Sequence, residues 1–391
     1  MRKVGYRIIA ALLGVACALV FAEVAVRLLL PPPERARLVA DSGHAERLAA
    51  ENAEQKLLRV DRSVDDPSAG GVLYFHTPTG MRFRANTRAV IQNHGLGGGT
   101  IEVRTNSLGY RNRELGVKDR PRVLFVGDSI TSQDYLQEEQ TIVRLVETLS
   151  ESTDRPIETV NSGVGAIGIG NELAILMETG FSAEPDTVVL NWYLNDAQAS
   201  AGIEIVELSG WWQHSRLAEQ LLASLSALDV QDLSVFSYEA DAAWKKQAAE
   251  AFPPAQGDWR REPGAFNQRI QALFFDWGSA WSEGAWARMA PVIAEMKRQC
   301  DLHGVRFRIV AFPVLEQINA EFVHDYPQQR LAEIARELDV PMLDLLPLLR
   351  EKSRQVNAPQ LHWDWCHPSP EGSVVIAGAI LDFLQREGGS T

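Results

Sequence analysis

From residue 122 onward, the chain alternates between short continuous apolar runs and longer segments in which apolar residues recur every three or four positions. Short apolar runs are typical of buried strands, and the longer spacing is typical of helices that cover them. The clearest strand candidates are residues 123–126, 157–160, 187–190 and 307–312. This alternation predicts a mostly parallel sheet between two layers of helices, with any chemistry at the carboxyl ends of the strands.

The first thirty residues have a different pattern. An apolar stretch of about the 20 residues that a bilayer requires follows the basic residues Arg2, Lys3 and Arg7, continues past Ala22 and stops at three prolines. We therefore expect residues 1–31 to be an uncleaved anchor in the inner membrane, with the following domain outside the cytoplasm, in the periplasm or at the cell surface. The alternative is a signal peptide cut after Ala22, which would release a secreted protein.

Between the anchor and the alternating region lie two further segments. Residues 32–70 are rich in alanine, glutamate and arginine, which predicts a helical or partly disordered stalk. Residues 71–120 contain short alternating runs broken by glycine turns, which predicts a β-rich lead-in to a catalytic domain at 71–391. That domain is interrupted at about 199–290 by a segment too long for a simple loop, which we expect to be a helical insertion rich in tryptophan.

Charge and composition narrow the classes of function. The 391 residues carry a formal charge of −13 without a run of lysine or arginine, so we expect no nucleic-acid partner. The apolar and charged fractions are those of an ordinary globular protein. Three cysteines make no disulfide framework, although an oxidising compartment would permit Cys300 and Cys366 to pair, and the sequence leaves that open.

The first candidate for chemistry is Ser129, in the sequence Gly127-Asp128-Ser129 that directly follows the buried run 123–126. This position places the serine at the carboxyl end of a strand and at the start of a helix. There it supplies a hydroxyl and a backbone N–H that can stabilise negative charge. The tripeptide alone is also typical of an ordinary turn with a helix N-cap.

A second candidate lies near the other end of the chain, where Asp364 precedes His367 by three residues. A nucleophilic serine needs a base, and a histidine base needs a carboxylate that orients it. A tight turn lets Asp364 reach Nδ1 of His367 and leaves Nε2 for Ser129. We therefore predict Ser129, His367 and Asp364 to be catalytic, without a cofactor.

A metal site is the competing interpretation of the same segment. Four possible ligands are packed closely there: His362, Asp364, Cys366 and His367. Neighbouring ligands face different ways and no second cluster stands out, so we expect no metal. His362 is expected to be structural.

Two further segments each follow a buried strand and therefore point into the same crevice. They offer Gly163, with Gly165 as an alternative, and Asn195. A glycine N–H and an asparagine amide are uncharged donors suited to an oxyanion, so we expect Ser129, Gly163 and Asn195 to form an oxyanion hole. Each segment alone is also typical of a turn or a strand-end cap.

Together, the four segments resemble those of the SGNH hydrolases, or GDSL esterases and lipases, over residues 122–386 without the insertion. The resemblance implies a flavodoxin-like three-layer α/β/α sandwich. One departure is Tyr193, which stands where the family usually has glycine. The segment 105–111 also looks like one that precedes the nucleophile in membrane-anchored bacterial members, although a plain turn with Arg111 packed on the domain is our expectation for it.

These features predict a serine esterase that removes acyl groups, with acetyl groups on cell-surface or exported glycans as the first choice. The tryptophans of the insertion could stack on sugar rings or fill its own core. One alternative is an O-acetyltransferase or accessory protein that works with a membrane-bound polysaccharide-modification partner. Another is a non-catalytic glycan-binding domain that keeps the fold.

Overall fold

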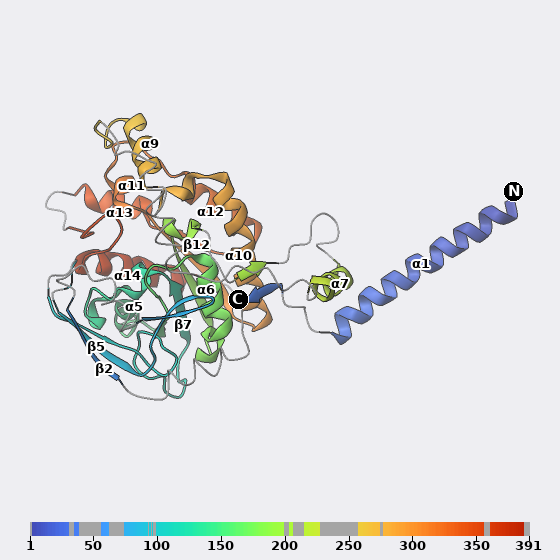
Figure 1. Ribbon diagram of the computed structural model, residues 1–391, viewed down its shortest axis with the longest axis horizontal. Helices are drawn as coiled ribbons and strands as arrows, with labels where there is room; N and C mark the ends of the chain where they lie inside the picture. The colour runs from blue at the N-terminus through green and yellow to red at the C-terminus, as the bar shows by residue number, and fades with distance from the viewer. Residues whose placement is uncertain are drawn as a thin grey trace. The chain divides into compact units, whose positions relative to one another are not determined.

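The computed structural model describes residues 2–30, 35–38, 56–61, 74–92, 94, 96, 99–198, 203–205, 215–226, 257–273, 277–355 and 360–386. The chain forms two compact units (Figure 1). One unit comprises Met1–Leu38 with Ile203–Ser234, and the other comprises Val39–Gly202 with Val235–Thr391. We call them the N-terminal unit and the main unit.

A five-stranded, fully parallel sheet forms the centre of the main unit. Its strands are β7 (Arg122–Gly127), β8 (Glu158–Asn161), β9 (Thr187–Tyr193), β11 (Arg306–Phe312) and β12 (Met342–Asp344). They lie side by side in the order β8-β7-β9-β11-β12. Numbered along the chain, this is the 2-1-3-4-5 order of a flavodoxin-like sheet, so the expected fold class is confirmed.

Helices cover both faces of this sheet (Figure 1). The strand that follows β7 in the chain, β8, lies on one side of it, and the next strand, β9, lies on the other side. Because both crossovers are right-handed, α5 (Ile142–Ser150) lies on one face of the sheet and α6 (Ile169–Glu178) on the other. The helix α14 (Pro370–Arg386) packs beside α5. The helix α10 (Glu283–Leu302) packs beside α6, and α12 (Tyr326–Glu337) connects β11 to β12.

Shorter helices fill the connections of the main unit. They are α4 (Ser129–Ser132), η1 (Glu138–Gln140), η2 (Gly180–Ala183), η3 (Leu194–Ala197), α9 (Pro263–Ala272), η6 (Gly278–Trp281), α11 (Leu315–Asn319) and α13 (Leu346–Ser353). The strand β7 is buried along its whole length, as its uninterrupted apolar run predicted.

The lead-in is β-rich, as the alternating runs predicted. An antiparallel hairpin pairs β3 (Tyr74–Thr77) with β4 (Gly80–Phe83). A three-stranded sheet has the order β2-β5-β6, with β5 (Thr87–Gln92) in the middle, β6 (Ile101–Arg104) antiparallel to it and β2 (Lys56–Asp61) parallel to it. The strand β2 falls inside the segment expected to be a helical or disordered stalk, and that expectation is wrong at these positions because their backbone pairs with β5.

The described residues of the predicted insertion belong to both units. They include β10 (Ile203–Ile205) and α7 (Arg216–Ser226) in the N-terminal unit, and α9, η6 and the start of α10, the crossover helix between β9 and β11, in the main unit. Trp286 of α10 is buried against Trp192 of β9, with ring centroids 5.5 Å apart. This tryptophan therefore fills the core beside the main sheet. Trp211, Trp212 and Trp244 lie outside the described residues.

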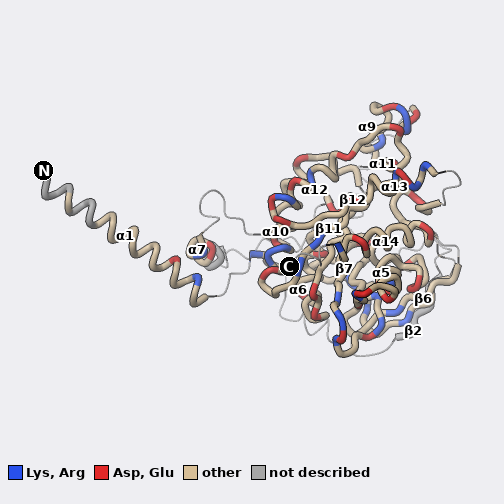
Figure 2. The backbone as a smooth tube through the Cα atoms, turned by 180° about the vertical axis from the view of Figure 1, so that it is seen from behind, with Lys and Arg blue, Asp and Glu red and all other residues tan. Residues whose placement is uncertain are grey.

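The N-terminal unit contains α1 (Arg2–Leu29), whose segment Ala11–Leu29 is long and apolar enough to cross a membrane, with a mean hydropathy of 2.2. The middle of α1 is free of charged positions (Figure 2). Towards its C-terminal end, the Glu23 carboxylate accepts hydrogen bonds from Ser215 Oγ at 2.9 Å, the Arg216 N–H at 2.8 Å and the Leu217 N–H at 2.9 Å. Glu23 thus caps the start of α7. The unit also pairs β1 (Ala36–Leu38) antiparallel with β10.

Candidate active site

The turn after β7 places Ser129 at the carboxyl edge of the main sheet, as predicted. Asp128 caps α4, because its Oδ1 accepts the N–H of Ile130 at 2.9 Å. A Cβ on Gly127 would overlap the Thr131 hydroxyl, so only glycine fits immediately before this turn. Ser129 is partly exposed although its neighbours in the turn are buried.

His367 lies between Ser129 and Asp364. Its Nε2 is 3.1 Å from Ser129 Oγ, and its Nδ1 is 2.6 Å from Asp364 Oδ2. The other oxygen of Asp364 accepts the backbone N–H groups of His367 at 2.7 Å and of Cys366 at 2.9 Å. These contacts orient the imidazole so that Nε2 faces the hydroxyl. The fold thus brings together three side chains that the sequence predicted to meet across 238 residues.

Neighbouring groups shift the pKa values of His367 and Asp364. Burial lowers the pKa of His367, but the hydrogen bond and negative charge of Asp364, with Asp128 and Asp134 adding, raise it overall above its ordinary 6.5. Burial raises the pKa of Asp364, but the hydrogen bonds and positive charge from His367 lower it overall. Asp364 is therefore a carboxylate near neutral pH, and it favours the imidazolium that forms when His367 accepts a proton.

Asn195 lies in η3, directly after β9, and its Nδ2 donates a hydrogen bond to Asp128 Oδ2 at 2.9 Å. The turn that carries it is closed by Asp196, whose Oδ2 accepts the N–H of Tyr193 at 3.0 Å. The Tyr193 side chain is only 1% exposed, so the tyrosine that replaces the usual glycine is accommodated in the interior.

Gly163 and Gly165 have different surroundings. The N–H of Gly163 donates to Asn161 Oδ1 at 3.1 Å, and an added Cβ would lie 2.5 Å from the backbone nitrogen of Ser132. Gly163 thus packs tightly against α4. A Cβ on Gly165 would instead lie 3.9 Å from Cβ of Ser129 and 3.3 Å from the Tyr74 hydroxyl. Of these two glycines, Gly165 is the one that faces the Ser129 side chain.

A cluster of buried carboxyl groups lies behind this edge, formed by Asp128, Glu172 and Asp196, each with 0% exposure. Burial, together with the charges of Asp196 and Asp128, raises the pKa of Glu172 well above its ordinary value. Burial and the charge of Asp128 raise the pKa of Asp196 in the same way. Sequence reasoning missed Glu172, because a single glutamate on an apolar helix gives no sign of where it points.

The metal interpretation named four possible ligands, and the structure brings three of them together. Single ligand atoms of Asp364, Cys366 and His367 lie within 4.8 Å of one another and could hold an ion. His362 is buried instead, and this burial lowers its pKa to about 4. Cys366 Sγ lies 3.3 Å from His367 Nδ1 and is not bonded to Cys300, since both cysteines are free thiols.

No protein-family model matches the chain, and no curated protein matches it in sequence. Solved structures do match it. One is described as a lipolytic protein of the G-D-S-L family from Desulfitobacterium hafniense, with 11% identity, a TM-score of 0.37 and coverage of 68% of this chain and 99% of that one. An acetylxylan esterase from Geobacillus stearothermophilus has 15% identity, a TM-score of 0.41 and coverage of 70% and 98%.

A further acetyl xylan esterase has 12% identity, a TM-score of 0.38 and coverage of 67% of this chain and 98% of its own. The neighbours of this chain among solved structures thus include G-D-S-L lipolytic proteins and acetylxylan esterases.

Proposed function

We propose that the protein is an SGNH-type serine hydrolase that cleaves acyl esters. The observation that carries the proposal is the continuous series of contacts from Asp364 through His367 to Ser129, at 2.6 and 3.1 Å, at the carboxyl edge of a flavodoxin-like sheet. Nucleophile, base and orienting carboxylate are in hydrogen-bond reach in the order that acyl transfer requires.

In the proposed reaction, His367 Nε2 takes the hydroxyl proton while Ser129 Oγ bonds to the ester carbonyl carbon. The tetrahedral intermediate collapses, the leaving alcohol receives the proton from His367, and an acyl-serine remains. Water, deprotonated by the same imidazole, then releases the acyl group as an acid and restores Ser129.

The oxyanion requires donors beside Ser129. We propose the N–H of Ser129, the side-chain amide of Asn195 and an N–H from the segment that holds Gly163 and Gly165. The contacts of that segment favour Gly165 over Gly163, because the Gly163 N–H already donates to Asn161 whereas Gly165 faces Ser129. An amide carries two hydrogens, so the bond from Asn195 to Asp128 leaves one for the oxyanion.

The proposed substrates are acetyl esters of cell-surface or exported carbohydrate. This proposal rests on an extracytoplasmic location, which α1 would give if it is a membrane anchor with the main unit outside. Extraction of membranes at alkaline pH tests the anchor: an anchored chain stays in the pellet, whereas a chain cleaved after Ala22 is released and starts at Glu23.

The decisive experiment is hydrolysis of p-nitrophenyl acetate by the full chain in detergent. Ser129→Ala and His367→Ala should each lower the rate by several orders of magnitude. Ser132→Ala is the matched control, because this buried hydroxyl lies one turn further along α4 and, among the described residues, has only a 3.4 Å hydrogen bond to the Ser129 carbonyl. A fluorophosphonate probe should label the wild type and Ser132→Ala but not Ser129→Ala.

Equal hydrolysis by all four proteins would contradict the proposal. Labelling of Ser129 without hydrolysis would instead indicate transfer to a sugar hydroxyl, the acetyltransferase alternative, and addition of an oligosaccharide acceptor should then consume the ester.

A further inference from the structure

The segment 105–111 forms a specific turn, and the proposed reaction gives this turn no role. Asn106 Oδ1 accepts the N–H groups of Leu108 and Tyr110, both at 3.0 Å, which closes a tight turn. Gly109 has a φ of +73°, and a Cβ there would lie 2.9 Å from the Phe83 carbonyl, so the turn requires glycine. This turn directs the chain so that Arg111 enters the interior.

Arg111 is only 2% exposed, and its guanidinium binds backbone carbonyls. Nη1 donates to Ser132 at 2.7 Å and also to Gln133, while Nη2 donates to Leu136 at 2.5 Å. All three carbonyls lie in residues 132–136, which run from the last residue of α4 into its connection to η1 and which we call the clamp loop.

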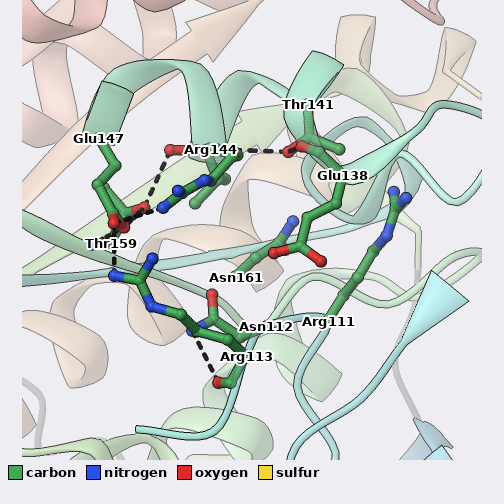
Figure 3. A pocket seen from close by; sticks show the side chains of 10 residues that line it. Arg111, Asn112, Arg113, Glu138, Thr141, Arg144, Glu147, Thr159 and Asn161 are labelled. Carbon is green, nitrogen blue, oxygen red and sulfur yellow. Dashed lines mark hydrogen bonds and ion pairs between the residues drawn. The ribbon is translucent and has the colours of Figure 1, made fainter. Parts of the chain in front are cut away.

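Two other arginines near Arg111 form ion pairs with a glutamate. Figure 3 shows Arg113 and Arg144 directed at Glu147, with which both form ion pairs. In the same view, Arg111 lies apart from these ion pairs, beside Glu138. Burial lowers the pKa of Arg111, partly offset by the negative charges of Asp134 and Glu138. A buried guanidinium committed to three carbonyls of one loop fixes the position of that loop.

The clamp loop is in contact with the proposed base. The Tyr135 ring, 1% exposed, packs edge-on to the His367 imidazole, with centroids 5.0 Å apart and an interplanar angle of 76°. Its neighbour Asp134 accepts a hydrogen bond from the Tyr74 hydroxyl at 2.7 Å, which ties the loop to the lead-in hairpin. The loop therefore contacts both the imidazole and the lead-in hairpin.

We propose that Arg111 is a positioning residue for His367: it holds the clamp loop, and the loop holds the imidazole through Tyr135 in line with Ser129. This inference rests on the proposed function of the same site. It assigns a role to the lead-in, which supplies both Arg111 and Tyr74 to the surroundings of the base.

The loop also carries part of the electrostatic environment of His367. Asp134 is one of three carboxylates whose charge raises the His367 pKa. The titratable groups around the imidazole come from its own segment, the β7–α4 turn and the clamp loop: His362, Asp364, Cys366, Asp128, Asp134 and Tyr135. A displaced loop weakens the contribution of Asp134, so the His367 pKa should fall.

The test compares Arg111→Lys with Arg122→Lys. Arg122 is a matched control, since it is 3% exposed and donates to the carbonyls of Ala183 at 2.6 Å and Gly116 at 3.1 Å, but it starts β7 at the sheet edge opposite Ser129. Lysine keeps the charge and cannot reach three carbonyls at once. We expect Arg111→Lys to lower kcat about 10- to 100-fold with KM little changed, and Arg122→Lys to keep both.

An NMR titration of histidine in the folded proteins separates this inference from the proposed function, because it needs no turnover. The His367 signal, identified by its loss in His367→Asn, should titrate at lower pH in Arg111→Lys than in the wild type or Arg122→Lys. An unchanged midpoint in Arg111→Lys would overturn the inference, whether or not the wild type hydrolyses the ester.

If Arg111→Lys does not fold, Tyr135→Leu replaces it, because this change removes the ring from His367 and leaves the Arg111 contacts intact. Without the ring, the imidazole is no longer held in line with Ser129, so Tyr135→Leu should lower kcat about 10- to 100-fold with KM little changed. Tyr135→Phe, which keeps the ring, should lower kcat much less. Equal kcat values for Tyr135→Leu and the wild type would equally overturn the inference.

Discussion

Asn195 Nδ2 donates a hydrogen bond to Asp128 Oδ2 across 2.9 Å, and this contact joins the end of β9 to the residue immediately before Ser129. The other oxygen of Asp128 caps α4 through Ile130. One carboxylate therefore sets both the start of α4 and the direction of the Asn195 amide. An amide held in this way can act as a donor without reorganising during the reaction.

Asn195→Ala should accordingly lower kcat for p-nitrophenyl acetate about 100- to 1,000-fold, because one oxyanion donor is lost, while KM changes much less. Asn112→Ala, at a partly exposed amide that contacts only the Arg113 carbonyl among the described residues, should keep the wild-type kcat. A loss confined to KM would show that Asn195 binds the ground state instead.

As the pH is lowered, kcat/KM should already begin to fall at a pH above 6.5. The His367 pKa is raised above its ordinary 6.5, and the imidazole acts as a base only when it is neutral. The kcat/KM value should therefore fall as pH decreases through that raised pKa. In Asp364→Asn, this fall should move to lower pH, and the rate should fall about 10⁴-fold because the imidazole loses its orientation. A fall that begins only below pH 6 in the wild type would contradict this electrostatic description.

Glu172→Gln should stabilise the folded protein at alkaline pH. The Glu172 pKa is higher in the folded chain than its ordinary 4.5, so the folded state binds more protons, and stability is lost as pH rises through the raised value. The melting temperature of Glu172→Gln should exceed that of the wild type more at pH 9 than at pH 5. An equal difference at both pH values would exclude a protonated Glu172.

The control for this measurement is Glu147→Gln, because the Glu147 pKa is shifted in the opposite direction. Burial raises that pKa, but the Thr159 N–H and the positive charges of Arg144 and Arg113 lower it overall. Its ionised form contributes stability above the ordinary 4.5 that is lost as pH falls through the lowered value. Glu147→Gln should thus destabilise the protein at both pH 5 and pH 9.

The two glycines should respond differently to alanine. Gly163→Ala places a Cβ 2.5 Å from the Ser132 nitrogen and should cost about 1–3 kcal/mol of stability in denaturant unfolding. Gly165→Ala meets the far end of Tyr74 at 3.3 Å, so it should fold and narrow the space beside Ser129. The activity of this variant on p-nitrophenyl butyrate should fall more than its activity on p-nitrophenyl acetate, because the longer acyl chain needs more of that space. Equal losses on both esters would show that the acyl chain does not lie beside residue 165.

The sequence predicted what depends on local pattern and strand order. The apolar runs gave the parallel sheet, and Ser129, Asp364 and His367 were found because each sits in a short, recognisable segment. The contacts of Arg111 with the clamp loop and of Glu172 with Asp196 could not be predicted, since they join positions far apart in sequence through tertiary packing. The β2 strand was missed because pairing with β5, rather than its own composition, makes it a strand.

The separation of 238 positions between the proposed nucleophile and base also has a consequence during synthesis. A ribosome adds about 5–20 residues per second, so Ser129 leaves the ribosome roughly 10–50 seconds before His367. Throughout this interval the nascent chain carries Ser129 without the imidazole that activates it in the proposed mechanism. On that mechanism, a chain cut short by premature termination before His367 is hydrolytically silent.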